Sequence, residues 1–96
     1  MAKVLDYPLL AALAAVIREG GFDRAAARLG VTPSAVSQRI RALEERVGAT
    51  LVVRSQPPVP TEAGARLCAH VARVQLLEGE LAADLPALAG QGPPAL

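Results

Sequence analysis

Four polar side chains recur at helical spacing in the middle of the chain: Ser34, Ser37, Gln38 and Arg41. A helix over 33–47, projected at about 100° per residue, carries three of them on one face, with the second serine beside them. Serine and glutamine hydrogen-bond to base edges in the DNA major groove, and arginine reaches guanine or a phosphate. The spacing therefore predicts a helix that contacts base pairs, although a solvated polar face on a small helical bundle would look the same.

The ends of this predicted helix differ in charge, which indicates how the helix would enter a groove. Thr32 is an N-cap candidate, Pro33 takes the first helical position, and the free N–H groups of the first turn attract phosphate. Glu45 lies on the polar face near the other end, where phosphates would repel it. We therefore expect the N-terminal half to enter the groove and the helix to leave it before Glu45.

A short wing is expected after this helix. The β-branched run 50–54 is followed by the proline-rich run 56–60, which cannot be helical, so a small β-hairpin is the economical interpretation. Arg54 would then reach the DNA backbone or the adjacent minor groove. The full set of expected DNA contacts is Thr32, Pro33, Ser34, Ser37, Gln38, Arg41, Arg54 and Pro58.

The charge is distributed unevenly along the chain, in a way that favours nucleic-acid binding. The formal net charge is only +1, but residues 1–60 carry eight Lys/Arg and five Asp/Glu, whereas residues 61–96 carry two and four. The basic surplus thus coincides with the expected DNA contacts, and binding to DNA should weaken steeply with salt.

Three helices are expected to position the polar face. The first, over 7–19, has Asp6 as a candidate cap; the second begins at a cap on Asp23 and stops at Gly30; the third is 33–47. A three-residue turn joins the last two and would fix a steep angle between them. With 52% apolar and 2% aromatic residues, the composition favours closely packed helices, so a mainly α fold is expected.

A longer helix should follow the wing, with Thr61 as its cap and Pro86 as its terminator. Its ~25 residues would extend ~37 Å, which is more than so small a core can cover. Part of its apolar stripe must therefore be covered elsewhere, and a second copy of the same helix is the simplest candidate. The residues expected at this dimer interface are Leu67, Val71, Val74, Leu77 and Leu81.

A set of residues across these elements resembles the N-terminal DNA-binding domain of LysR-type transcriptional regulators. It comprises Phe22, Ala25, Ala26, Leu29, Val31, Ser34, Ala35, Val36, Ser37, Ile40, Leu43, Glu44, Val47, Gly48, Leu51, Val53, Arg54, Thr61, Ala63 and Gly64. Within that family, the segments 33–40, 52–54 and 57–58 are similar to the branch that controls lysine and arginine export. Gln38 stands where many members of the wider family have arginine, so the base contact of that arginine is not carried over.

The resemblance implies a winged helix-turn-helix over 1–60, a linker and dimerisation helix over 61–86, and a hinge over 87–96. The hinge would lead toward an effector-binding domain of periplasmic-binding-protein type, which these 96 residues do not include. The family further implies antiparallel pairing of linker helices, dimers that assemble into tetramers, and lysine or arginine as effector. We expect a homodimer on an inverted-repeat operator, and no cofactor in this part of the protein.

Other functional classes have less support. One Cys and one His form no zinc-type cluster, and no nucleophile–base pairing or phosphate-binding loop indicates an enzyme. No apolar run approaches the ~20 residues that span a bilayer, and a cytoplasmic location is expected. A pure interaction module, dimeric but without affinity for DNA, is the alternative.

Three residues of the long helix allow two interpretations each. Cys68 is a packing residue or a redox sensor, and packing is favoured because the chain offers it no cysteine partner. His70 is a surface or dimer-interface residue or else a ligand, with the former favoured. Gly79 marks a close helix approach or fraying, and both interpretations stay open.

Overall fold

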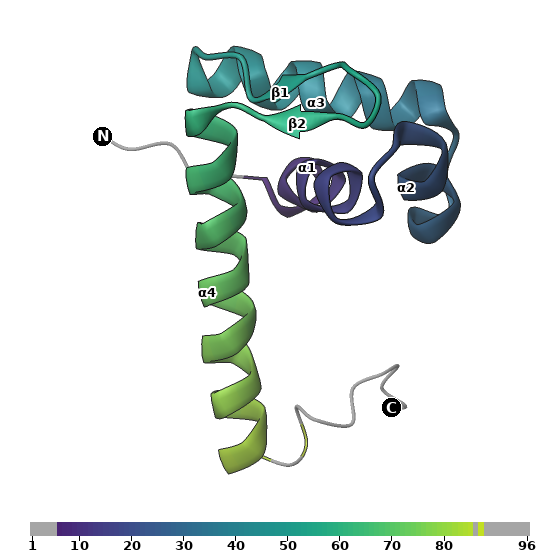
Figure 1. Cartoon of the computed structure of the whole chain (residues 1–96). Helices are drawn as coiled ribbons and strands as arrows, with labels where there is room; N and C mark the ends of the chain where they lie inside the picture. The colour runs from purple at the N-terminus through teal and green to yellow at the C-terminus, as the bar shows by residue number, and fades with distance from the viewer. Residues whose placement is uncertain (1–5, 86, 88–96) are drawn as a thin grey trace.

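The computed structural model describes residues 6–85 and 87. Within them, three helices, α1 (Tyr7–Glu19), α2 (Phe22–Leu29) and α3 (Pro33–Val47), form a compact bundle. Two short strands follow, β1 (Val52–Val53) and β2 (Val59–Pro60), and then the long helix α4 (Glu62–Asp84). The bundle lies beside the first turns of α4, and the rest of α4 extends away from it (Figure 1). The predicted mainly α fold is confirmed.

The ends of α1 and α3 lie where local signals place them. Gly20 and Gly48 end these helices with φ values of 77° and 79°, in the left-handed region that glycine adopts at little cost. At the start of α3, the Thr32 hydroxyl accepts a hydrogen bond from the Ala35 N–H at 3.0 Å. Asp6 precedes α1 in an extended conformation, but its side chain makes no capping hydrogen bond.

The start of α2 differs from the prediction. The helix begins at Phe22 with Gly21 as its N-cap, so Asp23 lies inside the first turn and is not the cap. An acidic side chain also stabilises a first turn, through the positive end of the helix dipole, which explains why the sequence pattern points to this residue. Phe22 is therefore the first residue of α2 and does not belong to the preceding turn.

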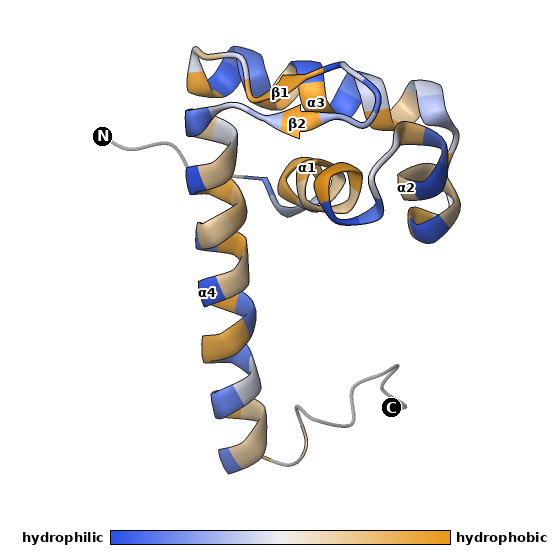
Figure 2. Cartoon of the chain, viewed as in Figure 1, coloured by the Kyte–Doolittle hydropathy of each residue, from blue (hydrophilic) through white to orange (hydrophobic). Residues whose placement is uncertain are grey.

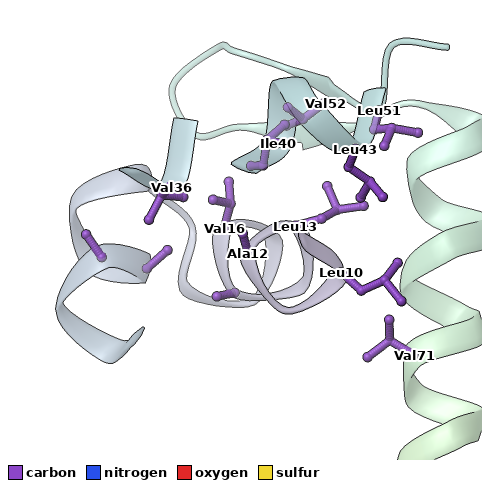
Figure 3. Close-up of a cluster of buried hydrophobic side chains, with 13 residues drawn as sticks. Leu10, Ala12, Leu13, Val16, Val36, Ile40, Leu43, Leu51, Val52 and Val71 are labelled. Atoms are coloured by element: carbon purple, nitrogen blue, oxygen red, sulfur yellow. The ribbon is translucent and has the colours of Figure 1, made fainter. Parts of the chain in front are cut away.

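The core joins all three bundle helices to the wing and to α4. Its largest fully buried side chains are Leu10, Leu13, Val16, Val36, Ile40, Leu43 and Leu51. Figure 3 shows Leu10 of α1 beside Val71 of α4, and Ile40 of α3 directed toward α1. Helix α1 thus packs against α3 and against α4, which makes it the central helix of the domain.

The wing is an antiparallel pair in which Val52 pairs with Pro60 and Val53 with Val59. Leu51, just before it, connects three elements. Its N–H donates to the Glu44 carboxylate of α3 at 2.9 Å, and its carbonyl accepts from the Thr61 N–H at 3.0 Å. These bonds and the buried Leu51 side chain fix the wing against the end of α3 and the start of α4.

The long helix α4 begins at Thr61 as predicted, and the Thr61 hydroxyl accepts from the Gly64 N–H at 3.1 Å. The predicted terminator, Pro86, and most of the predicted hinge lie outside the described residues. Figure 2 shows that hydrophobic residues continue along α4 beyond its contact with the bundle. None of the helices in 6–85 is long and apolar enough to cross a membrane.

Candidate nucleic-acid interface

The exposed face of α3 carries the predicted polar residues together. Ser34, Gln38 and Arg41 are exposed, and Thr32 and Pro33 are exposed at the N-terminal end of the same helix. On the opposite face Val36, Ile40 and Leu43 are buried in the core, and Val47 at the end of the helix is 38% exposed. The core contacts thus orient α3 so that its polar face is available to another molecule. That these residues contact DNA stays a prediction.

Ser37 has a different environment from the rest of the polar face. It is half-buried at the side of α3 that is next to the wing. Arg54, which follows β1, donates a hydrogen bond from Nη1 to Ser37 Oγ at 2.8 Å. The guanidinium carbon of Arg54 also lies 4.8 Å from the centroid of the Phe22 ring, within cation–π range. The Arg54 guanidinium thus contacts protein groups, whereas the sequence predicts that it contacts DNA.

Pro58 differs in burial from the other predicted DNA contacts, and its contact with DNA stays a prediction. Its side chain is buried, whereas Val59 beside it is exposed. Side chains alternate between the two faces of a β-ribbon, so neighbouring residues of the wing point in opposite directions. The side chain of Pro58 is therefore directed away from solvent.

The acidic residues at the end of α3 have separate roles. Glu44 is half-buried and accepts the Leu51 N–H, so it stabilises the junction with the wing. Glu45 is exposed on the polar face. Sequence reasoning included Glu44 only as part of the family resemblance and missed its structural role. Nothing local indicates it, because its partner lies seven positions further along the chain.

The residues of the predicted dimer interface differ in burial, and their contact with a second chain stays a prediction. Val71 is only 7% exposed and Leu67 is half-buried, and both pack on the core of their own chain. The helical spacing predicted that the core covers only part of the apolar stripe, and the part that it covers is the one nearest the bundle. Val74 is half-buried, while Leu77 and Leu81 are 59% and 49% exposed.

Sequence reasoning also missed Leu76, which is 64% exposed on another side of α4.

Among the residues with two interpretations, Cys68 is half-buried against the core, as a packing residue would be. Burial raises the pKa of its thiol above the usual value, and the positive charge of Arg18 partly opposes this. His70 is exposed. Within 6–85, no three His, Cys, Asp or Glu side chains gather as a metal site would need.

Two packed helices joined by a three-residue turn, an exposed polar face on the second, and a two-stranded wing define a winged helix-turn-helix, a class of DNA-binding domain. The chain belongs to the LysR family of bacterial regulatory helix-turn-helix proteins, whose family model matches residues 8–65. Its predicted class and family are thereby confirmed.

Relatives of known name are similar over most of this chain. The transcriptional regulator ArgP of Pseudomonas aeruginosa is 56% identical over 91 residues, which are 95% of this chain and 30% of that protein. The regulator LysG of Mycobacterium tuberculosis is 57% identical over 81 residues, 84% of this chain and 27% of LysG. The chain thus spans less than a third of these relatives.

Solved structures agree with these similarities. Full-length LysG of Corynebacterium glutamicum with bound effector Arg superimposes with a TM-score of 0.81 at 40% identity, over 93% of this chain and 31% of that one. The DNA-binding domain of CbnR in complex with DNA gives a TM-score of 0.74 at 28% identity, over 88% of this chain and 99% of that one. The fold on which this chain carries its polar face is thus one that binds DNA in CbnR.

Proposed function

We propose that the chain binds a specific inverted-repeat DNA sequence as a homodimer, with the N-terminal half of α3 in the major groove. The exposed face formed by Ser34, Gln38 and Arg41, opposite a face that is buried along the first three turns of α3, is the observation that carries this proposal. Exposed Arg24 and Arg46 lie on the same bundle and add charge that favours a phosphate backbone.

The test begins with selection of bound duplexes from a random pool, followed by affinity measurements on the selected sequence. Replacing both Gln38 and Arg41 by alanine should weaken binding at least tenfold, because each base contact contributes about 1–3 kcal/mol of discrimination. Glu45→Gln is the matched control on the same face and should bind at least as tightly as wild type. Unchanged binding by the double variant would reject the placement of α3.

Pairing of two chains is proposed to use the second half of α4. The charged residues of the first half are Glu62, Arg66 and Arg73, of which Glu62 and Arg66 form an ion pair at 3.9 Å, whereas those of the second half are all acidic: Glu78, Glu80 and Asp84. An antiparallel pair that joins the second halves brings Asp84 of one helix toward Arg73 of its partner, whereas a parallel pair would align every acidic residue with its own copy. Two helices paired in this way also relate two bundles by a two-fold axis, which an inverted repeat requires.

Sedimentation of matched variants tests this pairing. Leu77→Glu combined with Leu81→Glu should convert the protein to a monomer, because two buried charges would face each other across the helix pair. Leu76→Glu, on a different side of α4, is the control and should leave the dimer intact. Dissociation by the control alone would assign the interface to the other side of the helix.

In a form of the protein as long as its relatives, we propose that a further domain binds lysine or arginine and that the protein controls the export of these amino acids. The LysG structure with bound Arg supports the class of effector. Calorimetry with arginine should detect binding to the long form and none to the 96-residue chain. A reporter fused to the exporter promoter should respond to arginine or lysine only when the long form is present.

A further inference from the structure

Arg54 is the side chain that joins three parts of the proposed DNA-binding surface. It leaves the wing just after β1, hydrogen-bonds to Ser37 of α3 at 2.8 Å, and stacks over the Phe22 ring at the start of α2. The two partners are 17 and 32 positions away in the sequence. A planar guanidinium suits this place, because its face stacks on an aromatic ring while its N–H groups donate in the plane.

The hydrogen bond constrains the chemistry of Ser37. A serine hydroxyl has one hydrogen to donate and two lone pairs that accept, and a guanidinium only donates. The bond from Arg54 therefore occupies a lone pair of Ser37 Oγ and leaves its hydrogen for an acceptor elsewhere. A serine without this partner rotates freely and presents donor or acceptor with similar ease. Donation from a cation also polarises the hydroxyl, which strengthens it as a donor.

We propose that Arg54 is a positioning residue for DNA recognition, which holds Ser37 as a hydrogen-bond donor toward an acceptor on a base edge. In the major groove such acceptors are N7 of a purine, O6 of guanine and O4 of thymine. This inference rests on the proposed function, in which α3 lies in that groove. Arg54 then contributes to sequence preference through Ser37 and contributes little direct attraction to phosphate.

The experiment measures affinity for the selected duplex across a salt series, with wild type, Arg54→Gln, Ser37→Ala and the double variant. We expect each single variant to lose roughly 5- to 20-fold in affinity, the range of one hydrogen bond to a base. The double variant should bind like Ser37→Ala, because two residues that act through one contact are not additive. The slope of log affinity against log salt should be unchanged by Arg54→Gln.

A direct phosphate contact predicts the opposite on each point. Removing such a contact reduces the slope by about 0.9, and the losses of the two single variants add. Arg54→Lys would then keep most of the affinity, whereas a positioning role needs the planar group and loses affinity with lysine as well. Either the reduced slope or additive losses would overturn the proposal.

The base preference of the variants distinguishes a role of Arg54 in positioning Ser37 from a role in stabilising the fold. Repeating the selection with Arg54→Gln and with Ser37→Ala should relax the preference at the same base pair. If Arg54→Gln unfolds the domain, Arg54→Lys takes its place beside Ser37→Ala, because lysine keeps the charge and removes only the planar group. An unchanged preference with Ser37→Ala overturns the inference. Absence of any sequence preference in the wild type would instead reject the proposed function itself.

Discussion

The two halves of α4 share one continuous helix but lie in different surroundings. In the first half, Gly64 is buried against the wing and Val71 packs on α1 with 7% of its surface exposed. In the second half, Leu76, Leu77 and Leu81 are between 49% and 64% exposed. The hydropathy pattern hardly distinguishes the halves, since apolar residues occur along the whole helix (Figure 2).

The difference shows that one helix can belong to two structural units. The first half completes the core of a single chain, and its side chains determine whether the domain folds. The second half contributes little to that core, so its leucines are available to a partner. Substitutions in the first half should therefore change the free energy of unfolding, and those in the second half should change association between chains.

Gly64→Ala should have the largest effect. A Cβ at this position would overlap the Leu51 carbonyl group, which is backbone and is held by the Thr61 N–H. We expect the free energy of unfolding to fall by about 3 kcal/mol, because the overlap forces α4 away from the wing. Urea unfolding followed by circular dichroism measures it. A variant as stable as wild type would show that the close approach is not needed.

Val71→Ala should cost about 2 kcal/mol of stability, since it opens a cavity between α1 and α4 that the surrounding core only partly fills. Leu76→Ala removes a larger side chain from an exposed position in the other half. It should change the unfolding free energy by less than about 0.5 kcal/mol. Equal losses in the two variants would contradict the division of α4 into halves.

Thr61→Ala should cost about 1–2 kcal/mol, because it removes the cap at the start of the first half. The hydroxyl accepts from the Gly64 N–H and also donates to the Thr50 carbonyl oxygen at 2.6 Å. Thr61→Ser keeps both bonds and serves as the control in thermal unfolding. If serine and alanine gave the same melting temperature, the hydroxyl would have no role in holding α4 to the wing.

Gly79→Ala should stabilise the helix by up to about 1 kcal/mol, since alanine has the higher helix propensity. Nothing lies within 4 Å of a Cβ at this position, in contrast to Gly64. Helix content by circular dichroism should rise slightly and the monomer core should be unaffected. If the variant loses its dimer in sedimentation, Gly79 marks a close approach between two chains, which was one of its two interpretations.

The smallest effect is expected for alkylation of Cys68. The rate of this reaction measures how far the first half of α4 is buried, and it needs no substitution. The raised pKa of Cys68 means that less thiolate is present at neutral pH, so alkylation should be slower than for a free thiol and should accelerate at higher pH. Arg18→Ala removes the charge that lowers this pKa, so alkylation should slow further. A faster reaction in that variant would contradict the assigned cause.

Local signals determined most of the bundle. The caps Thr32 and Thr61, and the helix-ending glycines at 20, 30 and 48, act on backbone groups within a few positions. These signals therefore predict α1 and α3 with their observed bounds and the start of α4. Asp23 was misassigned because an acidic residue is favoured both as a cap and inside a first turn. The polar face of α3 was predictable because its apolar face repeats with helical spacing.

Contacts between distant segments were decided only by the tertiary structure. The bond from Arg54 to Ser37 spans 17 positions, and the pairing of Val71 with Leu10 spans most of the domain. Pro58 is buried and Val59 exposed because of how the wing packs, not because of their residue types. The helical spacing of apolar residues thus predicts that α4 has an apolar surface that another element or another chain must bury. Which of them α1 covers depends on where the bundle lies along the helix, and that is determined by Gly64 against the Leu51 carbonyl.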